Sequence, residues 1–128
     1  MITQNEIMPR ILFVDDDLLT LEMYEKIFNL YGYEVFLAES GMEALEKVND
    51  FELDLIVLDM RLPEMDGIEL LDRLKSNTSS SGILKIMASA NPELFRDRAI
   101  EAGADYFISK PITPEKIDMI LKNNKGEE

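Results

Sequence analysis

The chain has 128 residues with 46% hydrophobic side chains, which is enough for one domain with a buried core and leaves little room for a second. Its 13 basic and 26 acidic residues give a net charge of −13, which repels phosphate-rich partners, so we expect no binding to DNA, RNA or an anionic membrane. Cysteine and histidine are both absent, which excludes disulfides, thiolate chemistry, zinc fingers and a phosphohistidine on this chain.

Apolar segments are short throughout the chain. No apolar run exceeds four residues, and the polar start from Met1 to Glu6 is unlike a signal peptide, so we predict no membrane-spanning segment. Together with the absence of cysteine, this favours a cytoplasmic location. We expect one domain over residues 9–122, with flexible ends at 1–8 and 123–128.

The first predicted elements are a strand over residues 11–14 and a helix after it. The helix is predicted from a stripe of apolar residues at helical spacing, which are Leu21, Tyr24, Phe28 and Tyr31, widened by Met23, Ile27 and Leu30. We expect Asp17 to cap this helix by accepting bonds from its free amides. A second strand over 35–38 precedes a helix that begins with a capping-box pattern, Ser40 to Glu43.

Three further strand–helix units follow, with strands over 55–58, 83–88 and 106–108. Their helices are predicted to begin at Asp66-Gly67, Asn91-Pro92 and Thr113-Pro114, and Gly103 is predicted to end the fourth helix. The strands show little apolar/polar alternation, as expected for strands buried on both faces. The fold class is therefore α/β: a doubly wound, five-stranded parallel sheet in the flavodoxin-like order 2-1-3-4-5, with helices on both faces.

Polar residues follow four of the five predicted strands. In chain order they are Asp15-Asp16-Asp17, Asp59, Ser89 and Lys110-Pro111. Ligands of doubly wound sheets bind at the carboxyl ends of the strands, where the strand order reverses. This point lies between the first and third strands, so we expect Asp15, Asp16 and Asp59 to converge on one small pocket.

The chemistry of this pocket is predicted from the residue types. Several carboxylates at one point repel one another unless a cation or a proton relieves them, and oxygen ligands without His or Cys suit Mg²⁺. Lys110 adds a charge that can pair with a phosphoryl oxygen, and Ser89 adds a hydroxyl donor. These groups suffice for phosphoryl transfer to a carboxylate. Each residue alone has an ordinary explanation as a turn or loop residue, so the prediction rests on their joint placement.

The same segments resemble the receiver domains of bacterial two-component response regulators, over about residues 9–122. Four segments carry the resemblance: 11–17 (ILFVDDD), 55–67 (LIVLDMRLPEMDG), 86–90 (IMASA) and 102–111 (AGADYFISKP). By this resemblance, Asp59 is the phosphoacceptor that becomes an aspartyl phosphate. Mg²⁺ would be bound directly by Asp16 and Asp59, through water by Asp15, and by the backbone carbonyl of Arg61.

The resemblance also implies how the signal leaves the domain. Lys110 would bridge Asp59 and the phosphoryl group, Ser89 would follow that group, and Phe107 falls at the aromatic switch position. The Lys110–Pro111 bond resembles one that is cis in this family. The switch would reshape the face made by the fourth helix, fifth strand and fifth helix, which would bind a downstream protein or an output domain, or form a homodimer.

The implied phosphoryl donor is a histidine kinase or a histidine phosphotransfer protein. The chain would then be a signalling phosphoacceptor rather than an enzyme, although it would assist its own phosphorylation and dephosphorylation. The sequence leaves open whether it is a stand-alone regulator or a receiver excised from a longer protein.

Two other functions are considered. A haloacid-dehalogenase-type phosphatase would use Asp15 and Asp17 as nucleophile and acid, but Leu18 and Leu19 replace the usual continuation and no acidic pair follows Lys110. A pseudo-receiver would keep the fold as a binding module that is never phosphorylated.

Overall fold

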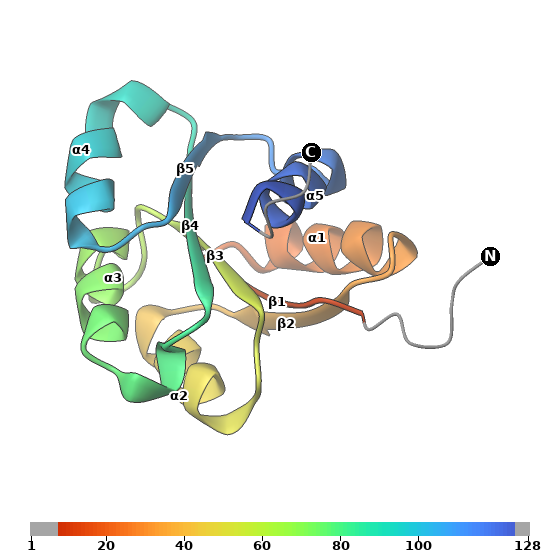
Figure 1. The fold of residues 1–128 in the computed structure, drawn as a ribbon, viewed down its shortest axis with the longest axis horizontal. Helices are drawn as coiled ribbons and strands as arrows, with labels where there is room; N and C mark the ends of the chain where they lie inside the picture. The colour runs from red at the N-terminus through yellow and green to blue at the C-terminus, as the bar shows by residue number, and fades with distance from the viewer. Residues whose placement is uncertain (1–7, 125–128) are drawn as a thin grey trace.

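Within residues 8–124, which the computed structural model describes, five strands and five α-helices alternate along the chain (Figure 1). The strands are β1 (Arg10–Val14), β2 (Glu34–Ala38), β3 (Leu55–Asp59), β4 (Leu84–Ser89) and β5 (Tyr106–Ser109). The helices are α1 (Leu18–Leu30), α2 (Gly41–Asp50), α3 (Gly67–Lys75), α4 (Pro92–Ala102) and α5 (Pro114–Asn124), with a 3₁₀ turn η1 (Thr78–Ser80) before β4. Every predicted strand is present, with bounds that differ by one residue at most.

The predicted flexible ends fall mostly outside the described residues, namely at 1–7 and 125–128. Of the described end residues, Met8 is exposed, whereas Asn123 and Asn124 form the last residues of α5. No helix among residues 8–124 combines the length and the apolar character that a membrane span requires.

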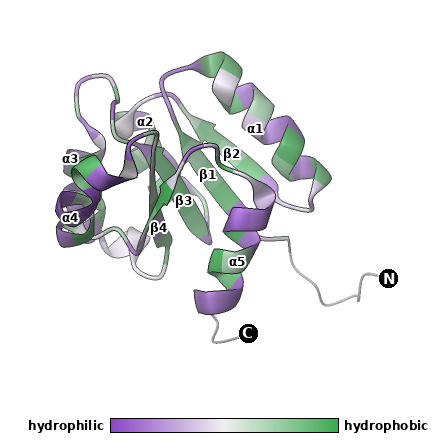
Figure 2. Cartoon of the chain, turned by 90° about the horizontal axis from the view of Figure 1, so that it is seen from above, coloured by the Kyte–Doolittle hydropathy of each residue, from purple (hydrophilic) through white to green (hydrophobic). Residues whose placement is uncertain are grey.

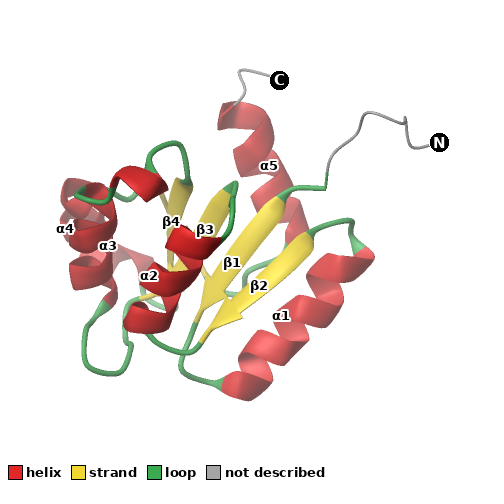
Figure 3. Cartoon of the chain, turned by 90° about the horizontal axis from the view of Figure 1, so that it is seen from below, coloured by secondary structure: helices red, strands yellow, loops and turns green. Residues whose placement is uncertain are grey.

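The five strands form one parallel sheet in the order β2-β1-β3-β4-β5, which confirms the predicted strand order. Helices α1 and α5 cover one face of the sheet, and α2, α3 and α4 cover the other (Figures 1 and 3). Two cores result, one on each face, so the predicted three-layer α/β architecture is confirmed.

The apolar runs form the strands of this sheet because each strand supplies side chains to both cores. In β1, Ile11 and Phe13 pack with α1 and α5, whereas Leu12 and Val14 pack with the other three helices. Successive side chains of a strand point to opposite faces, so a strand that is covered twice must be apolar at every position. Figure 2 shows β1, β2 and β3 as mostly hydrophobic, and the charged residues Arg10, Glu34 and Asp59 stand at the ends of these strands.

Helix α1 buries a narrower stripe than the sequence predicted. Leu21, Tyr24 and Phe28 are buried, but Leu30 is 85% exposed, Tyr31 is 57% exposed and Met23 is 50% exposed. The prediction that these last three residues belong to the buried stripe is therefore wrong. Helix α1 contacts the sheet along one side only, mainly at β1 and β2, so residues beyond that line of contact remain in water.

Some of the helix starts follow the predicted capping chemistry, but the side chains of Asp17 and Asn91 make no capping bond. Ser40 and Asp66 each accept a bond from an amide three residues later, at 3.1 Å and 2.9 Å. Gly103 ends α4 in the left-handed region with φ 118°, as predicted. Asp17 stands at the N-cap of α1, but its carboxylate accepts from the Thr20 hydroxyl at 2.7 Å and makes no capping bond, which corrects the prediction.

Candidate functional site

Strand pairing brings the predicted residues to one edge of the sheet. Val14 of β1 pairs with Leu58 of β3, so Asp15 and Asp59 follow neighbouring positions on adjacent strands. Ser89 ends β4, next to the pairing partner of Asp59, and Lys110 follows the residue that pairs with Ser89. The carboxyl ends of parallel strands thus collect groups that lie as much as 95 positions apart in the sequence, from Asp15 to Lys110.

Lys110 connects two of the carboxylates. Its Nζ lies 3.2 Å from Asp59 Oδ1 and 3.9 Å from Asp15 Oδ2. The backbone amide of Lys110 donates to the carbonyl of Ser89 at 2.9 Å, which ties the β5–α5 loop to the end of β4. The peptide bond between Lys110 and Pro111 is cis.

The backbone of neighbouring residues also orients the carboxylates. The amide of Met60 donates to Asp59 Oδ1 at 2.9 Å, and the amide of Asp17 donates to Asp15 Oδ1 at 2.9 Å. The loop before α1 is thus folded around the Asp15 carboxylate, which helps to explain why the Asp17 side chain makes no capping bond. Both carboxylates are therefore held by donors from their own loops as well as by Lys110.

The electrostatics of the site favour an added cation. Burial raises the pKa of the Asp15 carboxyl, and the negative charges of Asp59 and Asp16 add to the rise, while the Asp17 amide and Lys110 act in the opposite direction. Burial also raises the pKa of Tyr24 to about 12, with further contributions from Asp15 and Asp59. Negative charge at this edge is thus only partly compensated by the protein.

Of the three carboxylates predicted to bind the metal, the fold brings Asp15 and Asp59 together more closely than Asp16. Asp15 is 7% exposed and shares Lys110 with Asp59, whereas Asp16 is exposed. No three acidic side chains among residues 8–124 form a group that could by itself hold a metal ion. The oxygen-only donors and the uncompensated charge nevertheless fit Mg²⁺, which needs one or two carboxylates and fills its shell with water and phosphate oxygens.

Ser89 and Phe107 lie just behind this edge. Ser89 is 7% exposed, and its hydroxyl oxygen accepts a bond from the Asn91 amide at 3.0 Å. Phe107 pairs with Met87 across β4 and β5, is buried in the core beneath α4, and has the Arg96 guanidinium 5.5 Å from its ring centre. Arg61 is exposed in the loop after β3, and the role of its carbonyl stays a prediction.

Gly67 is a site residue whose importance the sequence did not reveal. A Cβ at this position would lie 2.5 Å from the Asp59 carbonyl oxygen and 2.8 Å from the Met87 side chain. Its amide also donates to the Met60 carbonyl at 2.7 Å. The start of α3 therefore packs directly against Asp59 itself and the residue after it, and only glycine leaves room for that approach.

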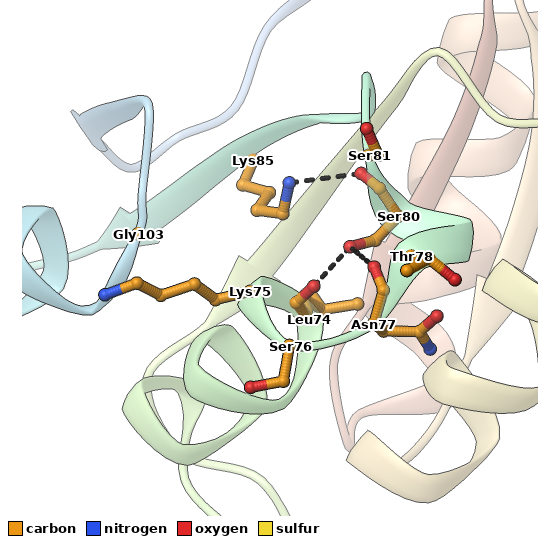
Figure 4. Close-up of a pocket in the computed structure, with 9 residues that line it drawn as sticks. All are labelled: Leu74, Lys75, Ser76, Asn77, Thr78, Ser80, Ser81, Lys85 and Gly103. Carbon is orange, nitrogen blue, oxygen red and sulfur yellow. Dashed lines mark hydrogen bonds between the residues drawn. The ribbon is translucent and has the colours of Figure 1, made fainter.

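A separate hollow lies on the surface between the end of α3 and the start of β4 (Figure 4). It has a volume of about 330 Å³ and contains two lysines, Lys75 and Lys85. The Lys85 ammonium donates to the Ser80 carbonyl at 3.2 Å, and the Ser80 hydroxyl donates to the carbonyls of Leu74 and Asn77. These polar groups fold the 76–82 loop onto α3, so the hollow is explained by local structure.

Residues 11–122 match the model of the response regulator receiver domain. The chain belongs to this family. A receiver domain is a signalling module of two-component systems, so the predicted family and the two-component context are confirmed.

This receiver domain is 35% identical over 111 residues to the transcriptional regulatory protein ZraR of Klebsiella oxytoca, which covers 87% of the chain and 25% of ZraR. A CheY-like receiver domain of Methanospirillum hungatei JF-1 is 34% identical with a TM-score of 0.79, covering 92% of this chain and 94% of that chain. The response regulator TrrA of Thermotoga maritima, solved in complex with Mg(2+)-BeF, is 28% identical with a TM-score of 0.77, covering 91% and 98%. The chain spans between 25% and 48% of the length of such curated relatives as ZraR and ArcA of Escherichia coli.

Proposed function

We propose that this receiver domain accepts a phosphoryl group on Asp59 from the phosphohistidine of a histidine kinase or histidine phosphotransfer protein, in a reaction that needs Mg²⁺. The observation that carries the proposal is the position of Asp59 at the end of β3, with the Lys110 ammonium 3.2 Å away and the buried Asp15 on the adjacent strand end. The Mg²⁺ complex of TrrA supports the choice of metal.

Different residues of the chain have different roles in the phosphoryl transfer. Met60 and Lys110 both approach Oδ1 of Asp59, which leaves Oδ2 to attack phosphorus. As the new O–P bond forms, the P–N bond to the donor histidine breaks and its electron pair returns to the imidazole, which takes up a proton from solvent. Lys110 offsets charge on the phosphoryl oxygens, and the Ser89 hydroxyl can donate to one of them.

Mg²⁺ would be held by Asp15, Asp16 and Asp59 and by the carbonyl of Arg61, and its charge would offset that of the carboxylates and the phosphoryl oxygens. The raised pKa of Asp15 supports this assignment, because burial and the charges of Asp59 and Asp16 leave its carboxylate poorly compensated by the protein.

The proposed output is a change of the face made by α4, β5 and α5. Movement of the Ser89 hydroxyl toward the phosphoryl group would alter the packing of Phe107 beneath α4. This face would then bind a downstream protein or an output domain, or form a homodimer. We keep the cytoplasm as the proposed compartment, with no role in binding nucleic acid or membranes.

The test is labelling of the purified chain with acetyl phosphate and Mg²⁺. We expect one acid-stable, base-labile phosphoryl group, which Asp59→Ala and EDTA both abolish, and which Asp16→Asn strongly reduces. Asp97→Ala, which changes an exposed carboxylate in α4, serves as the matched control and should label normally.

Each other labelling result would favour a different function for this chain. Label that survives in Asp59→Ala but is lost in Asp15→Asn would favour the phosphatase-type nucleophile. A chain that takes no label at all would be a pseudo-receiver, and label that ignores EDTA would remove the metal from the proposal.

A further inference from the structure

Lys116, in the first turn of α5, forms hydrogen bonds to the loop that carries Lys110. Its ammonium donates to the carbonyl oxygen of Ser109 at 2.9 Å and to that of Pro111 at 2.8 Å. These two carbonyls belong to the residues immediately before and after Lys110. The backbone of Lys110 is therefore held from β4, through the carbonyl of Ser89, and from α5, through Lys116.

The helix itself does not explain a lysine at this position. The amide of Lys116 donates to the Thr113 hydroxyl at 3.3 Å, so Lys116 stands three residues after a capping threonine, where a capping box has an acidic residue. A positive charge in the first turn also opposes the helix dipole. A residue that contradicts the local preference of its helix points to a role elsewhere, and the contacts of Lys116 place that role in the 109–111 segment.

We propose that Lys116 is a positioning residue for phosphoryl transfer, which clamps the 109–111 segment so that the Lys110 ammonium stays between Asp15 and Asp59. This inference rests on the function proposed above. Lys110 has a long, flexible side chain, so the position of its ammonium depends on where its backbone is fixed. Displacement of a catalytic group by about 1 Å can slow a reaction up to about 100-fold.

Loss of the clamp should leave the fold intact. Ile112 of the same loop and Ile117 of α5 belong to the core beneath α1 and α5, and Pro114 is also buried, so the segment is anchored without Lys116. Lys116 itself is only partly buried, and its two bonds join it to backbone groups near the surface.

The experiment compares Lys116→Met, which keeps the apolar stem and removes the donors, with Lys116→Arg, which can still donate to two carbonyls. Lys122→Met, an exposed lysine on the same helix, controls for the lost charge. With acetyl phosphate and saturating Mg²⁺, the labelling rate should fall roughly tenfold in Lys116→Met, return toward the original value in Lys116→Arg, and stay unchanged in Lys122→Met.

A double-mutant cycle with Lys110→Ala separates positioning from general destabilisation. If Lys116 acts through Lys110, Lys116→Met has no further effect on labelling in the Lys110→Ala background. An equal slowing in both backgrounds, or no slowing in either, would overturn the proposal. Circular dichroism confirms that each variant is folded, and Lys116→Gln replaces Lys116→Met should the latter unfold.

A second readout does not depend on phosphorylation. Amide hydrogen exchange at Lys110 should accelerate at least severalfold in Lys116→Met, and the side-chain NMR signals of Lys110 should shift, because the 109–111 segment loses its two hydrogen bonds to the Lys116 ammonium. If the unaltered chain takes no label, the proposed function has failed, and these NMR measurements alone decide whether Lys116 positions Lys110. Unchanged exchange and unchanged signals would refute the clamp.

Discussion

Asp15 shows, at the scale of single residues, how the charges of the site oppose the stability of the fold. Its carboxylate is buried beside Asp59, and both effects raise its pKa above the ordinary value of 3.8. A carboxyl group with a raised pKa in the folded state favours folding only while it is protonated. This contribution is fully present below the unfolded pKa and is lost as the pH rises through the folded value.

We therefore expect Asp15→Asn to raise the free energy of unfolding of the metal-free protein at about pH 7. The gain should disappear as the pH falls below the ordinary value of 3.8, where the original side chain is also neutral. Urea unfolding in EDTA at several pH values measures both effects. Asp97→Asn, an exposed change of the same charge, is the control, and a less stable Asp15→Asn would show that the carboxylate is held for structural reasons.

At the scale of elements, the junction between β3 and α3 fixes the position of Asp59, the proposed phosphoacceptor. Asp66 caps α3 with a bond to the amide of Glu69, and Gly67 lies against the Asp59 backbone. The helix start thus serves as a support behind Asp59. A shift of this junction would move the carboxylate relative to Lys110.

Gly67→Ala tests this support. Its Cβ would meet backbone at 2.5 Å, so the junction must move, and we expect a loss of about 1–3 kcal/mol in the free energy of unfolding. Labelling of Asp59 should slow as well. In Gly32→Ala the new Cβ meets nothing within 4 Å, so only the strain of φ +89° applies, at about 1 kcal/mol, and labelling should stay normal. Equal effects of the two substitutions on labelling would contradict the proposed support.

At the scale of the whole molecule, the proposed function requires a signal to pass from the proposed metal-binding edge of the sheet to the face made by α4, β5 and α5. Ser89 and Phe107 lie on adjacent strands between the two, and Phe107 is already buried with Arg96 over its ring. A phosphoryl group is a small change, so the readout needs packing with two close-lying states. Phosphorylation would have to rearrange the contact between Phe107 and α4 to be sensed on the surface.

Beryllofluoride, which mimics the phosphoryl group, tests this route by NMR. With Mg²⁺ present, we expect large chemical-shift changes at Asp59, Ser89 and Phe107 and along the exposed side of α4, because one rearrangement connects them. Residues of α2, which covers the same face of the sheet as α4 but lies over β1 and β2, provide the internal control. Changes confined to the residues around Asp59 would show that this switch is absent.

Much of the fold and the composition of the site could be predicted from local patterns. The apolar runs predicted all five strands, and the polar residues after them predicted which side chains meet at the sheet edge. This worked because a parallel sheet brings the ends of its strands together, whatever the loops between them contain. Ser40, Asp66 and Gly103 likewise act within a few residues of their position, so their capping roles followed from sequence alone.

The hydrogen-bond partners and the burial of individual side chains could not be predicted from local patterns. Leu30 and Tyr31 continue an apolar stripe in the sequence, yet the stripe extends past the sheet and these residues meet water. The sequence by itself determined the strand pattern and the types of group at the site, because periodicity and chain order are local properties. Only the tertiary structure decided the pKa of Asp15, the close approach of Gly67 to Asp59 and the grip of Lys116 on the Lys110 loop, since burial and hydrogen-bond partners depend on which distant elements pack together.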